Sequence, residues 1–328
     1  MSAVYLFEYP EAAAVAEALK LKPDRRFAPV GAAVTGPTTP RAIGDSPFVA
    51  INGSGNHHHE TLGLVAALAA EDPARSFSYL HLDAHPDTGE LYRWRYNCAS
   101  FVGRVLELPQ VAEVDLIGIN PAVLETEGTG SVYFRNLHYY HCDYFAKLRQ
   151  WTVEEGPIDE TYFGASEDDL RRALKNPAIA KAKMKEVRPP KSETAYPALV
   201  VKWRPLSALD PSQLPEAPIY VSVDLDVLKL DLVTDWRKSP RRSAPTPFGV
   251  PENQGEMSLP TLLALIAQLG AARPMLGADV CGLTERLGEL SPEAQATSIQ
   301  TTAAVVEALQ AALAAKPKKK PKLTSRSR

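Results

Sequence analysis

Cysteine is scarce in this chain, and its spacing argues against some classes of protein. Only three of the 328 residues are cysteine, and no two of them form a CxxC pair. Widely spaced cysteines in an odd number argue against a disulfide framework and against a structural zinc site. We therefore expect a protein of a reducing compartment, the cytoplasm.

Long apolar runs and a strong net charge are also missing. No run is long enough to cross a bilayer, which takes about 20 apolar residues. Met1–Pro10 lacks the basic and then apolar pattern of a signal peptide. The formal net charge is -3, which argues against a generally basic nucleic-acid surface. We expect neither a membrane nor a nucleic acid as a partner of the core of the chain.

Short apolar segments typical of buried strands alternate along the chain with segments of helical composition. About 45% of the residues are apolar, which is enough for a sizeable core. The alternation predicts an α/β fold with a central, mostly parallel sheet. The expected strands are Ala3–Phe7, Phe48–Asn52, Tyr79–Leu82, Val114–Ile119, Ala198–Trp203, Ile219–Val223 and Met275–Val280, and the expected helices are Glu11–Leu21, Thr61–Ala70, Cys98–Leu108, Leu259–Leu269 and Pro292–Ala315.

The domain organisation that we expect is a single domain over residues 1–315 followed by a tail. Arg25–Pro47 is rich in Pro and Gly and predicts a loop. Residues 139–197 mix charged helical pieces with Gly and Pro and predict an insertion, which either shapes an active site or is a peripheral appendage. Residues 316–328 are mostly Lys, Pro, Ser and Arg and predict a disordered basic tail. It could be a nuclear signal, a patch for an anionic partner or a solubility tail.

The strand Tyr79–Leu82 leads into alternating ligand-type residues. Asp83, His85 and Asp87 follow it at every second position. Alternate side chains of an extended chain point to the same face, and open α/β sheets place active sites at the carboxyl ends of their strands. Carboxylates with imidazole suit Mn, Zn or Fe. A polar corner whose acids accept backbone N–H bonds would explain the same residues.

Two further strand ends carry residues of the same kind. The histidines His57, His58 and His59 follow the strand Phe48–Asn52 and a Gly-rich turn, and Asp224 and Asp226 alternate at the end of Ile219–Val223. Carboxylates gathered at one site repel one another and shift their pKa values, and divalent cations remove that penalty. Four aspartates with two histidines suit a pair of metal ions better than a single ion.

Three motifs, in their order along the chain, resemble those of the arginase/agmatinase (ureohydrolase) family. That family has Gly-Gly-Asp-His, then Asp-Ala-His-x-Asp, then Ser-Phe-Asp-x-Asp. Here the motifs read Gly55-Asn56-His57-His58, Asp83-Ala84-His85-Pro86-Asp87 and Ser222-Val223-Asp224-Leu225-Asp226. The resemblance implies a three-layer α/β/α fold and a homo-oligomer. It also implies two Mn2+ ions per chain, with other divalent metals possible.

The resemblance also implies a division of ligands between the two ions. One ion would take a histidine of the first motif with Asp83, Asp87 and Asp224, and the other would take His85, Asp83, Asp224 and Asp226. Asp83 and Asp224 would bridge. Matching Gly55-Asn56 to the family's Gly-Asp selects His57 as the first ligand, whereas the register of the following helix, through Thr61, selects His58. We favour His58 because that register needs no gap.

The chain departs from the family where the family binds substrate. Gly282 stands where the family has the Glu that holds the guanidinium, and Val250 stands where it has a supporting Thr. Glu285 is our candidate replacement, with Glu256 and Glu252 as alternatives. The family's loop histidine for proton transfer is also missing, and we consider Cys98 as a catalytic residue in its place.

The function that these patterns predict is hydrolysis of a C–N bond in a guanidino or amidino substrate by a metal-bound hydroxide. The substrate would be a small molecule or a peptide-borne group, and not free arginine or agmatine in the usual mode. The alternative is a catalytically silent relative that keeps its metals and acts by binding a partner. A third hypothesis, deacetylase-like chemistry with a single zinc ion, fits the four aspartates less well.

Overall fold

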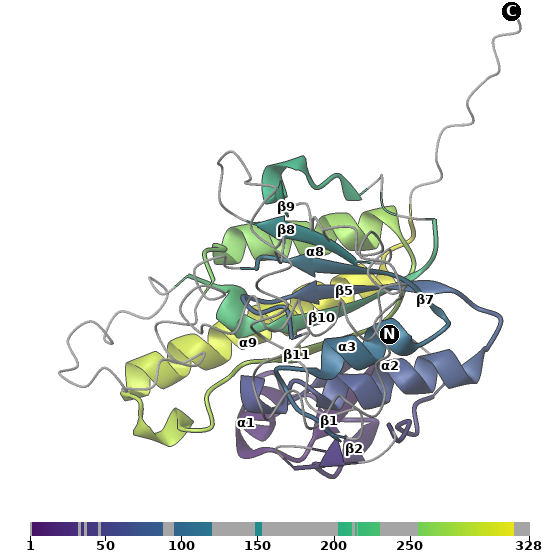
Figure 1. The fold of residues 1–328 in the computed structure, drawn as a ribbon. Coiled ribbons are helices and arrows are strands. Elements are labelled where there is room, and N and C mark those ends of the chain that lie inside the picture. Colours follow the sequence, from purple (N-terminus) through teal and green to yellow (C-terminus); the bar gives the residue numbers. More distant parts are fainter. Residues whose placement is uncertain are drawn as a thin grey trace, which may run out of the picture.

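A single sheet of parallel strands organises the described part of the chain (Figure 1). The structure, a computed structural model, describes residues 2–31, 34–35, 38–44, 47–87, 95–119, 148–152, 203–211, 214, 216–229 and 255–317. Within these ranges nine strands pair in the order β2-β1-β4-β11-β10-β5-β7-β8-β9, and every pairing is parallel. The strands are β1 (Ala3–Phe7), β2 (Arg25–Phe27), β4 (Phe48–Ile51), β5 (Phe77–Leu82), β7 (Val111–Ile117), β8 (Leu148–Thr152), β9 (Trp203–Pro205), β10 (Ile219–Asp224) and β11 (Met275–Cys281).

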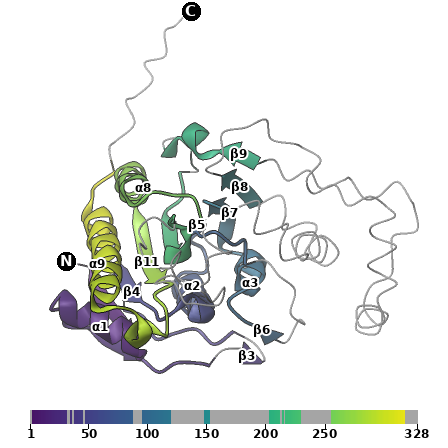
Figure 2. The same cartoon turned by 90° about the vertical axis from the view of Figure 1, so that its left-hand side faces the viewer.

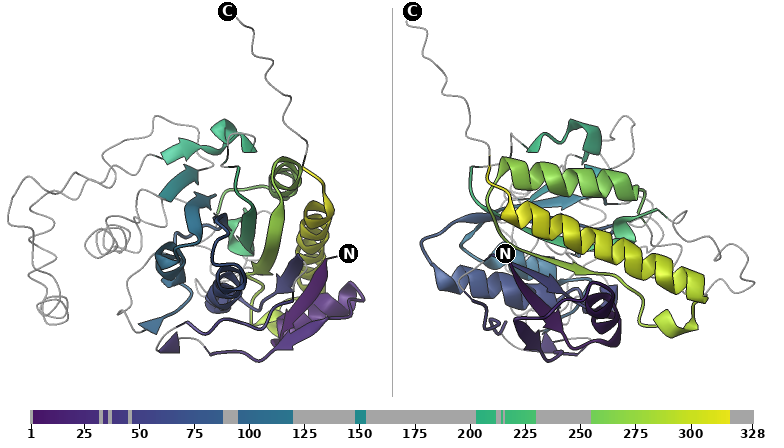
Figure 3. Two further views of the ribbon diagram at one scale, coloured as in Figure 1. Left: turned by 90° about the vertical axis from the view of Figure 1, so that its right-hand side faces the viewer. Right: turned by 180° about the vertical axis from the view of Figure 1, so that it is seen from behind.

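Helices cover both faces of this sheet. Helices α1, α8 and α9 lie on one face, and α2 and α3 lie on the other (Figure 2). The view from behind shows α8 and α9 crossing the strands side by side (Figure 3). The predicted three-layer α/β/α fold is therefore confirmed. The bounds of the helices are α1 (Pro10–Ala18), α2 (Glu60–Glu71), α3 (Phe101–Glu107), α8 (Leu259–Ala272) and α9 (Pro292–Ala314).

The central strands are apolar because helices bury them from both sides. Every residue of β4, β5 and β10 is buried, which matches the continuous apolar composition expected of a parallel sheet. Aromatic rings pack across these strands: Tyr5 stacks on Phe48 at 4.6 Å between ring centroids, and Tyr79 stacks on Tyr220 at 6.0 Å. The core thus surrounds the middle of the sheet.

Serine caps and prolines set where the long helices begin. Ser258 accepts a hydrogen bond from the backbone N–H of Thr261 at the start of α8, and Ser291 accepts one from Ala294 at the start of α9. Pro260 is the second residue of α8 and Pro292 the first residue of α9, positions where the missing N–H of proline costs nothing. The caps and the prolines together fix where both helices begin.

One expectation about irregular chain was wrong in part, and a strand lies within the predicted insertion. Arg25–Phe27 was expected in a loop but forms the edge strand β2, whose two exposed arginines hide the strand pattern. Leu148–Thr152 lies within the predicted insertion yet pairs with β7 as strand β8. The short strands β3 (Val34–Thr35) and β6 (Arg95–Tyr96) also pair, antiparallel, apart from the main sheet. Most of residues 139–197, and the tail beyond Pro317, lie outside the described residues.

The helices of the described ranges include none with the length and apolar character that a membrane crossing requires.

The contact between α8 and α9 gives a test of the packing. A Cβ atom on Gly270 would lie 2.6 Å from the Cβ and 2.7 Å from the Cα of Ala312. Although alanine favours a helix by up to about 1 kcal/mol over glycine, we expect Gly270→Ala to destabilise the protein by about 1–3 kcal/mol, because the two helix backbones must separate. Urea unfolding measures the change. Gly288→Ala is the matched control, since a Cβ there meets nothing within 4 Å; equal effects of both substitutions would contradict the packing.

Candidate metal centre

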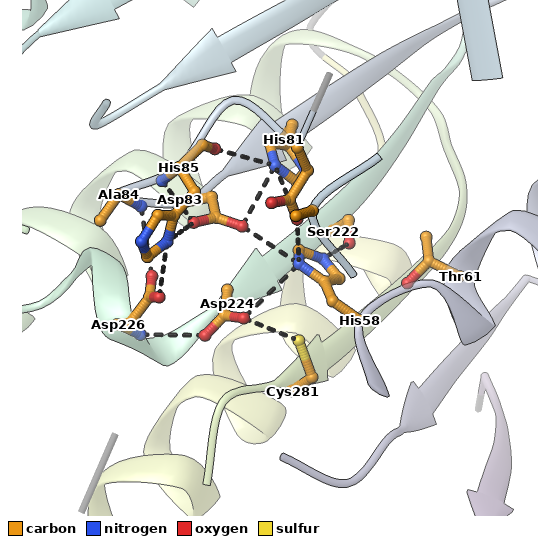
Figure 4. A network of polar contacts seen from close by, with 12 residues as sticks. His58, Thr61, His81, Asp83, Ala84, His85, Ser222, Asp224, Asp226 and Cys281 are labelled. Atoms are coloured by element: carbon orange, nitrogen blue, oxygen red, sulfur yellow. Dashed lines mark hydrogen bonds and ion pairs between the residues drawn. The ribbon is translucent and has the colours of Figure 1, made fainter. Parts of the chain in front are cut away.

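The ends of neighbouring parallel strands bring the predicted ligands together (Figure 4). Asp83 follows β5 directly, Asp224 ends β10, and Asp226 lies in the short 3-10 helix Leu225–Val227. His58 lies in the turn before α2. Because β5 pairs with β10, with Leu82 beside Val223, the residues that follow these two strands share one edge of the sheet.

One group of ligand atoms surrounds the Nδ1 atom of His58. This nitrogen lies 3.1 Å from Oδ2 of Asp83, 3.2 Å from Oδ2 of Asp87 and 3.5 Å from Oδ2 of Asp224. Nevertheless, Nδ1 of His58 and Oδ2 of Asp83 are buried without a hydrogen-bond partner, and buried polar atoms are rarely left so. Ligands that each lie about 2.1 Å from one ion are separated by roughly 3.0–3.4 Å. A divalent cation therefore fits among these atoms.

A second group of ligand atoms lies on the other side of Asp83. Nδ1 of His85 lies 2.9 Å from Oδ2 of Asp226 and 3.2 Å from Oδ1 of Asp83. Asp83 thus turns one oxygen toward each group. The side chain of His85 is 20% exposed, whereas that of His58 is fully buried. The second group is therefore the one that solvent can reach.

The charges of the four aspartates call for a cation. Burial, together with the Asp83 carboxylate, raises the pKa of Asp87 to about 8. Burial and the neighbouring carboxylates also raise the pKa values of Asp224 and Asp226. For Asp83, burial raises the pKa, but His81, His58 and His85 outweigh it and hold the pKa well below its usual value. Divalent metal ions would let all four carboxylates ionise, so the residues fit such a centre.

Hydrogen bonds behind the site leave Nδ1 of His58 free to bind. Nε2 of His58 lies 2.8 Å from the hydroxyl of Ser222, and that hydroxyl donates to Asp279 at 3.0 Å. The Ser222 oxygen therefore accepts from Nε2–H, which leaves the Nδ1 lone pair directed at the carboxylates. Asp279 is fully buried and also accepts hydrogen bonds from Thr61 and Tyr220.

The structure places His57 and Glu285 together and apart from both groups. Nε2 of His57 lies 3.2 Å from Oε1 of Glu285, and the imidazole stacks on Tyr9 at 4.1 Å. Glu285 also accepts hydrogen bonds from Ser54 and Asn56. Of the two histidines that the sequence left open, His58 is the one beside Asp83. Glu285 is held by these neighbours and not by the metal ligands.

The remaining residues that the sequence suggested for catalysis or substrate binding are Cys98, Glu252 and Glu256, with Val250 at the position of the family's supporting threonine. Burial, with the Asp87 carboxylate, raises the pKa of Cys98 to about 12. Glu256 is exposed. Val250 and Glu252 lie outside the described residues. The catalytic role of Cys98 remains a prediction.

Two residues of the site were missed by the sequence analysis. Nε2 of His81 lies 3.1 Å from Oδ2 of Asp83, and its ring stacks on His58 at 4.9 Å. The alternation that selected Asp83, His85 and Asp87 extends back to His81 and could have found it. The second is Cys281, whose thiol donates to Oδ2 of Asp224 at 3.4 Å; only the pairing of two distant strands reveals that contact.

Comparison with known proteins gives similar structures but no match in sequence. No family model matches the chain, and no curated protein matches it. The solved structures that it resembles include members of the arginase family. A hypothetical agmatinase from Burkholderia thailandensis is 14% identical, with a TM-score of 0.47, over 94% of this chain and 86% of its own. The proclavaminate amidino hydrolase of Streptomyces clavuligerus is also 14% identical, with a TM-score of 0.49, over 95% and 93%.

A third similar structure is the formimidoylglutamase of Bacillus subtilis, which is 10% identical, with a TM-score of 0.49, over 96% of this chain and 87% of its own. The strand order establishes the fold, and the geometry described above supports a candidate metal centre.

The placement of the two histidines predicts different effects on metal binding. We expect His58→Ala to weaken Mn2+ binding by at least about 10–100-fold, the loss typical even of a residue that only orients a ligand. His57→Ala removes a neighbouring imidazole that contacts Tyr9 and Glu285, so it should leave the affinity within about threefold. Equilibrium dialysis with elemental analysis measures both. The opposite ranking of the two variants would reject this placement.

Proposed function

We propose that this chain is a metal-dependent hydrolase that cleaves a C–N bond of a guanidino or amidino substrate. One observation carries the proposal: two groups of buried ligand atoms share Asp83, whose Oδ2 lies 3.1 Å from His58 and whose Oδ1 lies 3.2 Å from His85. Asp83 would contribute one oxygen to each of two ions, and a pair of ions would supply an activated water for attack on a planar carbon.

The ligands divide between two proposed Mn2+ ions as the resemblance implies. His58, Asp83, Asp87 and Asp224 would hold one ion, and His85, Asp83, Asp224 and Asp226 would hold the other. Bound metal would supply Lewis acidity and a water that is nucleophilic near neutral pH. Oxygen-rich donor sets with imidazole suit Mn2+.

Backbone groups of the same loop fix the carboxylates in place. The N–H of His85 donates to Oδ1 of Asp83 at 2.6 Å, and the N–H of Ala84 donates to Oδ1 of Asp226 at 3.2 Å. These bonds orient the carboxylates before any ion binds, which lowers the cost of assembling the centre. The partly exposed His85 marks the side from which we expect the substrate to approach.

The backbone at Gly282 bears on which substrate can bind. This glycine has a φ of +97°, and a Cβ atom there would lie 2.1 Å from Oδ1 of Asp224. Neither glutamate nor any other side chain fits at this position without displacing Asp224. A guanidinium buried without a carboxylate partner binds poorly. We therefore propose a modified or peptide-borne guanidine, or a less charged amidino group, and not free arginine or agmatine in the usual mode.

The glycine at position 282, where the family has a substrate-binding glutamate, also supports the alternative function, a metal-binding protein that does not turn over substrate. It would keep the two ions for structure and act by binding a partner. The stretch Asn97–Phe101 contains no histidine for proton transfer, as this alternative requires.

A substrate panel separates the two functions. We expect Mn2+-loaded protein to release urea or ammonia from at least one guanidino, formimidoyl or peptidyl-arginine compound, and to be weakest on free arginine and agmatine. Asp226→Asn is the matched inactive control, because it removes one ligand charge at nearly constant volume. Full metal occupancy without turnover on any member of the panel would favour the non-catalytic alternative.

Gly282 itself is a further test. We expect Gly282→Ala to lower Mn2+ affinity by at least about tenfold, because the new Cβ displaces the Asp224 carboxylate and its backbone must adopt a positive φ. By the same reasoning Gly282→Glu should not create arginase activity. Metal titration followed by dialysis measures the first effect, with Gly288→Ala as the control. Unchanged affinity in Gly282→Ala would show that Asp224 is not held against this backbone.

A further inference from the structure

Cys281 lies at the end of strand β11, on the edge of the sheet where the candidate metal centre lies. It is the last residue of β11 and pairs in register with Asp224, while Asp279 pairs with Ser222 two residues earlier. Alternate residues of a strand point to the same face. The side chains of Cys281 and Asp279 therefore lie on the same face of β11, toward Ser222 and His58.

The thiol sits among polar ligand atoms. Its Sγ lies 3.4 Å from Oδ2 of Asp224, the same oxygen that lies 3.5 Å from Nδ1 of His58. One ligand atom from each of these three residues falls within 4.8 Å of the others. A buried cysteine that only fills space has apolar neighbours, whereas this one faces a carboxylate and an imidazole.

The unpartnered nitrogen of His58 is a second and independent sign of a ligand at this place. His58 is fully buried, and its Nδ1 has no hydrogen-bond partner. The distance between Sγ and Oδ2 of Asp224 also fits shared coordination. Bonds of about 2.3 Å to sulfur and about 2.1 Å to oxygen, at angles between octahedral and tetrahedral, separate the two atoms by roughly 3.1–3.6 Å.

We propose that Cys281, as a thiolate, ligates the ion that His58 holds. The inference rests on the proposed function only in requiring a metal at this group. On binding, the S–H bond breaks, its proton leaves to solvent, and the sulfur electron pair forms the bond to the ion. A soft thiolate ligand shifts the preference of this position from Mn2+ toward Zn2+, while the His85 group keeps nitrogen and oxygen donors. The two metal positions are therefore chemically different.

Cobalt reports this ligation directly. Metal-free full-length protein loaded with Co2+ should show a sulfur-to-metal charge-transfer absorption in the near ultraviolet, because nitrogen and oxygen donors alone give none. We expect Cys281→Ser to abolish this band and to move the Zn2+/Mn2+ selectivity at least about tenfold toward Mn2+. Cys98→Ser, the matched control, should keep the band.

A measurement on the unmutated protein guards against a variant that fails to fold. Zinc-edge X-ray absorption of the Zn2+-loaded chain should detect a sulfur neighbour at about 2.3 Å. Bound metal without a sulfur neighbour, or a band that persists in Cys281→Ser or is lost in Cys98→Ser, would overturn the inference and leave the proposed function standing. A chain that binds no metal would overturn both.

Discussion

The repulsion among four buried aspartates is the constraint on which the rest of this site depends. Asp83, Asp87, Asp224 and Asp226 are at most 8% exposed, and three of them have raised pKa values because burial and their neighbours oppose ionisation. A fold can keep such a cluster only if protons or cations neutralise it. The buried atoms of His58 and Asp83 that have no hydrogen-bond partner are where a cation would bind.

The parallel sheet supports this cluster from behind. Asp279 on β11 accepts from Ser222 on β10, and Ser222 in turn meets the far nitrogen of His58. Three segments that are distant in sequence are thereby locked together, and one imidazole nitrogen is committed to the chain so that the other faces the ligands. The same buried network ties the stability of the sheet to the geometry of the site, because Tyr220 and Thr61 also donate to Asp279.

Gly282 and Cys281 are adjacent in the chain, and both lie against Asp224. Gly282 leaves no room for a side chain against Asp224, and Cys281, directly before it, places a sulfur beside the same carboxylate. Both residues lie against the Asp224 carboxylate, so a substitution at either position would act on that carboxylate.

Local patterns in the sequence determined most of the strands, the long helices and most of the candidate ligands. Asp83, His85 and Asp87 share a face because side chains alternate along extended chain, and that rule needs no knowledge of the fold. The tertiary structure decided what depends on register between distant strands. It placed His58, and not His57, beside Asp83, held Glu285 beside Ser54 and Asn56, and set Cys281 opposite Asp224. The edge strand β2 and the strand β8 also emerged only there, because pairing along the sheet, and not apolar composition, defines them.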